Sequence, residues 1–138
     1  YIDAMKKAGL YNGDLILHIN YHSTEEEKVE EVIRFFENNK SIDGVLFLAN
    51  YMGLAGLQAF HRMGIKIPED LSVVAFTDGI ISKYSTPTIT TISQNGIKMG
   101  RKAAEMLIKR LELEDEEDEH YKTEIIETNL IIRESTKS

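Results

Sequence analysis

Short apolar runs alternate with amphipathic patterns along this chain, and that alternation restricts the possible fold more than any other feature. Three runs, 15–19, 45–49 and 71–76, are almost continuously apolar. Strands covered on both faces have this composition, because parallel sheets carry helices above and below. Helical periodicity fills the intervals between the runs. We therefore expect an α/β fold with a doubly wound parallel sheet and right-handed crossovers.

The spacing of apolar residues predicts three main helices. The first covers about 24–39, and Thr24 and Glu27 at its start have the spacing of a capping box. The second covers about 52–64. The third covers about 95–112 and carries one continuous apolar stripe.

The remainder of the chain contains no internal repeat and no Gly/Ser/Pro linker. We expect a loop over 77–88, a short β-branched run over 89–92 and a β-rich segment over 123–133. The chain is thus predicted to form one compact unit. It begins at Tyr1 without a Met, so we expect that an upstream segment has been cut away.

The net charge of −7 is a local property of the chain. The stretch 112–119 holds seven of the 23 acidic residues, so the remaining 16 equal the 16 Lys and Arg in number. Such a stretch is typical of a solvated, mobile loop. No basic stripe is present, which argues against direct contact of this chain with DNA.

The sequence lacks the common signatures of catalysis and of metal or nucleotide binding. It has no Cys, which excludes disulfides and thiol chemistry and fits a reducing, cytoplasmic location. The phosphate-binding glycine motifs, the serine-hydrolase elbow and zinc-type His spacings are also missing. His18 lies inside an apolar run, and we interpret it as a hydrogen-bonded core residue rather than a catalytic base. We expect no enzyme, no cofactor and no metal.

Polar and aromatic residues follow each apolar run. In an open α/β sheet, ligands bind outside the carboxyl ends of the strands. Amide, hydroxyl, carboxylate and ring groups there would suit a polyhydroxylated ligand. The alternative is that Asn50 and Thr77 simply cap the elements that follow. The candidate ligand-binding residues are Asn50, Thr77, Asp78, Tyr51, Tyr21 and His22.

Four motifs in sequence resemble those of the LacI/GalR family of transcriptional regulators. The stretch 49–59 is similar to A-N-D-x-x-A-x-G-x-x-x-A, and 64–76 resembles G-x-x-[IV]-P-x-D-[IL]-S-[VL]-[VI]-G-[FY]. The stretch 87–100 resembles P-x-L-T-T-[IV]-x-Q…G, and 130–136 is similar to L-x-x-R-x-S-T. Together these motifs cover most of the chain.

The resemblance implies that 1–138 is part of an effector-binding domain, the C-terminal lobe of a type I periplasmic-binding-protein-like unit. The helix at 95–112 would belong to the N-terminal lobe, and its stripe would otherwise fold back or pair with a second copy. The DNA-binding helix-turn-helix domain would lie upstream, so operator DNA would be bound only through that absent part. The effector would be a small molecule of the saccharide class, and no membrane partner is expected.

Family members carry Asp at two positions of the binding site, where this chain has Tyr51 and Thr77, while Asn50 matches the family residue. The resemblance also implies a homodimer, with interface residues Leu54, Ala55, Gln58, Ile80, Ile81 and Ser85. Two other classes stay open. One is a sugar-binding transport receptor without a DNA-binding head, and the other is a small α/β enzyme.

Overall fold

The structure is a computed structural model that describes residues 1–112 and 122–137. The expected acidic loop at 112–119 lies outside these residues except for Glu112. The described elements in chain order are α1 (Ile2–Lys7), the 3-10 helix η1 (Gly13–Leu15), α2 (Glu25–Asn38), β1 (Gly44–Phe47), α3 (Asn50–Met63), β2 (Ser72–Ala75), α4 (Ile80–Tyr84), β3 (Thr90–Ser93), α5 (Gly96–Glu112) and β4 (Asn129–Ile131).

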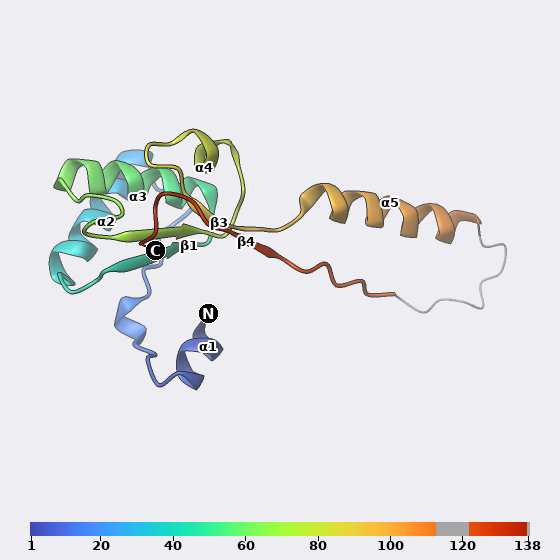
Figure 1. Ribbon diagram of the computed structural model, residues 1–138, viewed down its shortest axis with the longest axis horizontal. Coiled ribbons are helices and arrows are strands. Elements are labelled where there is room, and N and C mark those ends of the chain that lie inside the picture. The colour runs from blue at the N-terminus through green and yellow to red at the C-terminus, as the bar shows by residue number, and fades with distance from the viewer. Residues whose placement is uncertain (113–121, 138) are drawn as a thin grey trace.

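The strands form one sheet in the order β1-β2-β3-β4. β1 and β3 each pair with β2 in parallel, and Phe47 of β1 lies opposite Ala75 of β2. The predicted parallel α/β architecture is therefore confirmed. β4 pairs with β3 in the antiparallel direction, so the sheet is mixed, with one antiparallel strand at the edge next to β3. In Figure 1, α2, α3 and α4 lie above the sheet and α1 lies below it.

The prediction of a strand over 15–19 was wrong. Leu15 ends η1, and the residues after it pair with no strand. Leu17 and Ile19 pack against the hydrophobic core, so side-chain burial explains the apolar run without a place in the sheet. His18 is exposed rather than a core residue, because alternate side chains of extended backbone point in opposite directions.

The predicted helices are confirmed with small shifts at their ends. Thr24 caps α2 in a reciprocal capping box with Glu27, whose carboxylate accepts the Thr24 N–H at 2.7 Å. These contacts hold the pKa of Glu27 below its usual value, although desolvation opposes them. α3 ends at Gly64 in the left-handed conformation (φ 70°), which glycine adopts without a steric penalty. α4 falls within the stretch that was expected to be a loop.

The core lies where α2 and α3 pack against the sheet. Val32 and Phe36 of α2, Phe60 of α3 and Phe47 of β1 are buried there. The rings of Phe36 and Phe60 meet edge to face with their centroids 4.8 Å apart, a favoured aromatic geometry. This packing holds both helices against the sheet.

α5 projects away from the sheet (Figure 1). None of its residues is buried, and Ile97 is 86% exposed. Of the two outcomes expected for its apolar stripe, folding back onto this chain is therefore wrong for the described residues. No helix in the described part of the chain has the length and apolar character required to cross a membrane.

Candidate functional site

The carboxyl ends of β1 and β2 bring Asn50 and Thr77 together. Because Phe47 pairs with Ala75, the chain leaves both strands at the same edge. Asn50 and Thr77 line one small cavity, and the Asn50 amide approaches Gly79. We call this edge, made of residues 20–23, 49–51 and 76–79, the rim.

Neither side chain caps a helix, so the capping interpretation was wrong. The N-cap of α3 is Ala49 and that of α4 is Gly79, and neither helix start has a side-chain capping bond. Within residues 1–112 and 122–137, the side chains of Asn50 and Thr77 form no hydrogen bond. The amide and the hydroxyl therefore remain available to a ligand.

Aromatic side chains form the other side of the rim. The ring of Tyr21 meets those of His22 and Tyr51 edge to face, with centroids 5.5 Å apart in both pairs. The ammonium of Lys28 lies 5.2 Å from the centre of the Tyr51 ring and 5.9 Å from that of Tyr21. The structure thus gathers five of the six predicted ligand residues in two adjoining groups, with Tyr51 following Asn50 directly in α3.

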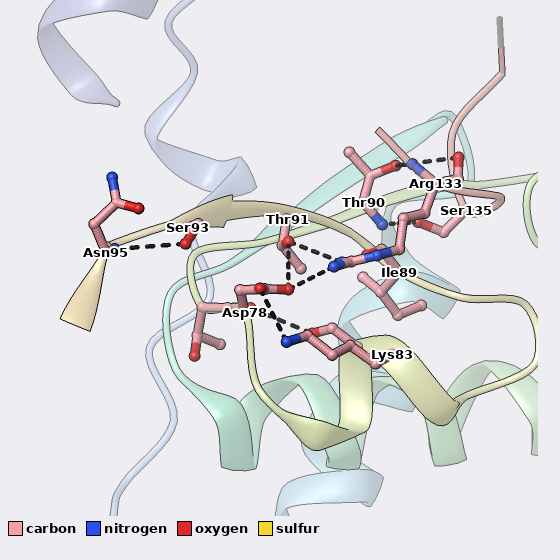
Figure 2. Close-up of polar contacts among 11 residues, drawn as sticks. Asp78, Lys83, Ile89, Thr90, Thr91, Ser93, Asn95, Arg133 and Ser135 are labelled. Carbon is pink, nitrogen blue, oxygen red and sulfur yellow. Dashed lines mark hydrogen bonds and ion pairs between the residues drawn. The ribbon is translucent and has the colours of Figure 1, made fainter. Parts of the chain in front are cut away.

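Asp78, the sixth predicted residue, is occupied by contacts within the protein. Its Oδ1 accepts hydrogen bonds from Arg133 Nη2 at 2.6 Å and from Thr91 Oγ1 at 3.2 Å, and its Oδ2 lies 3.4 Å from Lys83 Nζ. Figure 2 shows these groups converging on the carboxylate. The hydrogen bond from Arg133, helped by Lys83, holds the pKa of Asp78 below its ordinary value, although burial acts in the opposite direction.

Two residues at the rim were not among the predicted ligand residues. Gln94, which follows β3, donates from Nε2 to the Phe76 carbonyl at 2.8 Å and so stands beside Thr77. Lys28 is almost fully buried. The signal for Lys28 was present in the sequence, because it precedes Val32 by four residues and Phe36 by eight, on the buried face of the helix.

The predicted dimer residues have different environments. Leu54, Gln58 and Ile80 are exposed, whereas Ile81 and Ser85 are half-buried. Ala55 was expected at this surface, but it is only 1% exposed and belongs to the core.

A cavity of about 390 Å³ separates the segment 15–19 from β1. Phe35, Phe36 and Tyr51 contribute to its lining, which is largely apolar. The cavity occupies the space beside the edge of β1, where the predicted strand would have paired. Within the described residues, no group of three or more acidic, His or Cys side chains could hold a metal ion.

Nearly the whole chain matches a known domain family. The model for the periplasmic binding protein-like domain matches residues 1–136. The chain is 32% identical over 115 residues to the transcriptional repressor PurR of Haemophilus influenzae, an alignment covering 83% of this chain and 34% of the relative. It is 29% identical over 136 residues to the regulator CelR of Thermobifida fusca, with 98% of this chain and 38% of the relative covered.

Solved structures of transcriptional regulators are also similar to this chain. A complex of the regulator CelR with cellobiose matches with a TM-score of 0.79 and 28% identity, covering 98% of this chain and 40% of that one. A LacI-family regulator from Sanguibacter keddieii matches with a TM-score of 0.86 over 100% of this chain and 52% of that one, and its 24% identity concerns the fold alone.

The chain spans only 34% to 38% of the length of these two curated relatives. Its match nevertheless extends over nearly all of its own residues, and the relatives are regulators of the expected type. The chain therefore belongs to the periplasmic binding protein-like domain family, in the LacI/GalR branch of that family.

Proposed function

We propose that this chain is the effector-sensing part of a transcriptional regulator and that its rim binds a saccharide or a related metabolite. The observation that carries the proposal is the meeting of Asn50 and Thr77, both without intramolecular side-chain hydrogen bonds among the described residues. An amide and a hydroxyl supply the paired donors and acceptors that sugar hydroxyls need. The adjoining rings of Tyr21 and Tyr51 offer apolar surface to a sugar ring.

Ligand binding would act through a conformational equilibrium of the whole regulator. A ligand shifts such an equilibrium only by its difference in affinity for the two states. The rim would form one side of a cleft between two lobes, and the DNA-binding head would lie in the part of the protein outside this chain. The relatives are regulators, which favours this function over a transport receptor, and such a protein would work in the cytoplasm without catalysing a reaction.

We also propose that α5 packs in the complete protein against the other lobe. Its exposed apolar residues need a partner surface, because large apolar patches rarely stay uncovered in soluble proteins. They are Ile97, Met99, Leu107, Ile108 and Leu111. The relatives are more than twice as long as this chain, which leaves room for such a lobe.

A thermal-shift screen of sugars on the full-length protein tests the proposed site. A sugar present at about 100 times its Kd stabilises a protein by about 2.7 kcal/mol, so the Tm of the wild type should rise by several degrees. Asn50→Ala and Thr77→Ala should each weaken binding by about tenfold, because each removes hydrogen bonds to the ligand.

The matched control is Asn38→Ala, an exposed position at the end of α2 away from the rim. Its Tm shift with sugar should equal that of the wild type. A sugar that stabilises the wild type, Asn50→Ala and Thr77→Ala equally would contradict the site. No response to any saccharide would contradict the proposed ligand class.

A further inference from the structure

Lys28 is a buried cation with an exposed counter-ion. Its side chain is 6% exposed, whereas the side chain of Glu25, whose Oε1 lies 2.7 Å from the ammonium, is 65% exposed. A charge removed from water requires a partner, while a carboxylate on the surface loses little when it returns to water. The two members of this pair therefore differ in mobility: Lys28 stays in place, and Glu25 can leave.

The rings of Tyr21 and Tyr51 keep the ammonium in position at the rim. Both ring centres lie within 6 Å of Nζ, the range in which aromatic faces attract cations. Other acids at the start of α2 have their own partners, since Glu26 bonds with Arg62 and Glu27 closes the cap on Thr24. Glu25 is the carboxylate paired with Lys28 among the described residues.

We propose that Lys28 recognises an anionic oxygen of the effector, which replaces Glu25 on the ammonium, while Asn50 and Thr77 bind hydroxyls of the same molecule. The effector then belongs to the phosphorylated or acidic saccharides rather than the neutral ones. Tyr51 joins the two halves of the site, because it follows Asn50 in α3 and contacts Lys28 through its ring. This inference rests on the proposed function.

The test compares matched ligands on the full-length protein at constant ionic strength. The probes are glucose, glucose 6-phosphate, gluconate and inorganic phosphate, with the corresponding ribose and fructose sets, and Kd is measured by calorimetry. An anionic form should bind the wild type about tenfold or more tightly than its neutral parent, as expected for a charge-assisted hydrogen bond. Tighter binding of the sugar phosphate than of the sugar acid identifies the anionic group as a phosphate, and the reverse order identifies it as a carboxylate.

Variants separate recognition from structure. Lys28→Met keeps the length and apolar stem of the side chain and should abolish the preference for the anionic form, whereas Lys28→Arg should retain it. Glu25→Gln removes the competing carboxylate, so the anionic ligand should bind several-fold more tightly and raise the Tm more than it does in the wild type. The matched controls are Glu37→Gln, at an exposed position near the other end of α2, and Lys40→Met, at an exposed position just beyond that end. Neither should change the preference for the anionic form or the Tm shift.

The outcomes distinguish this inference from the function on which it rests. Binding of a neutral sugar with no preference for its anionic form, unchanged by Lys28→Met, would overturn the role of Lys28 and leave the sensing function intact. Stabilisation by inorganic phosphate that depends on Lys28, without binding of any saccharide, would support the anion site and contradict saccharide sensing. No binding by any probe would overturn both.

Discussion

Asp78 and Arg133 form an ion pair that links the rim to the end of the chain. Both side chains are largely shielded from solvent, at 17% and 16% exposed. Arg133 also donates from Nη1 to the Ile89 carbonyl at 2.7 Å and to Thr91 Oγ1 at 2.9 Å. One guanidinium thus ties the loop after β2 to β3.

We expect Asp78→Asn to destabilise the protein by about 1–3 kcal/mol at pH 7, because it leaves a partly buried guanidinium without its charged partner. The pKa of Asp78 is lowered from its ordinary value of 3.8 in the folded protein. The carboxylate therefore contributes stability above that pH and loses it as the pH falls through the lower, folded value. Urea unfolding of the wild type and of Asp78→Asn, followed by circular dichroism from pH 7 to pH 3, measures this contribution to the free energy of unfolding.

The difference between wild type and Asp78→Asn should stay constant down to about pH 4.5 and shrink below it. Asp43→Asn, at an exposed position, is the control and should leave the free energy of unfolding close to the wild-type value at pH 7. A wild-type advantage that grew on acidification would contradict the assignment of Asp78 as the ionised partner.

At the scale of elements, one glycine sets how closely α3 approaches β1. A Cβ on Gly56 would fall on the ring of Phe47, while a Cβ on Gly53 would meet that ring at an ordinary 3.9 Å. The Phe47 ring is itself buried and packs beside Phe60, with centroids 6.1 Å apart, so it has little room to move. The small residue therefore fixes the position of Asn50 at the start of the same helix.

Gly56→Ala should destabilise the protein by about 1–3 kcal/mol through overpacking, in spite of the better helix propensity of Ala. Gly53→Ala is the matched variant on the same helix and should be neutral or stabilising by up to about 1 kcal/mol. Chemical denaturation measures both, and equal effects of the two substitutions would refute the close approach at Gly56. Gly56→Ala should also weaken ligand binding, because it displaces Asn50.

At the scale of the molecule, α5 and the predicted dimer residues are the surfaces that we expect to meet partners outside this chain. Ile80 begins α4 directly after the rim and is exposed. The residues that remain as proposed contacts between two copies are Leu54, Gln58, Ile80, Ile81 and Ser85. The stripe of α5 is a second exposed surface, on an element that projects from the sheet (Figure 1). Both surfaces are expected to be covered in the complete regulator.

The isolated chain should therefore self-associate. Light scattering across a concentration series should give a mass above that of the monomer, since the α5 stripe has no other lobe to cover it. Leu107→Glu with Leu111→Glu should return the chain towards a monomer, and Lys109→Glu, at an exposed position on the opposite face of α5, should not. A wild-type chain that stays monomeric throughout would contradict the proposed role of the helix.

The sequence by itself determined the elements whose signals are local. Periodicity located α2, α3 and α5, the spacing of Thr24 and Glu27 identified a cap, and the order of apolar runs predicted parallel pairing of β1 and β2. These signals predict the elements correctly because residues close together in the chain create them. Once the two strands are taken as parallel neighbours, Asn50 and Thr77 fall at one edge of the sheet, because each follows the carboxyl end of its strand.

Only the tertiary structure decided features that depend on residues far apart in sequence. Apolar composition could not show whether 15–19 pairs with β1 or only packs on the core, because both arrangements bury the same side chains. The sequence could not show that the Asp78 carboxylate pairs with Arg133, which lies 55 residues later. The place of Lys28 on the buried face of α2 follows from its spacing, but only the tertiary structure shows that its ammonium lies beside the rings of Tyr21 and Tyr51.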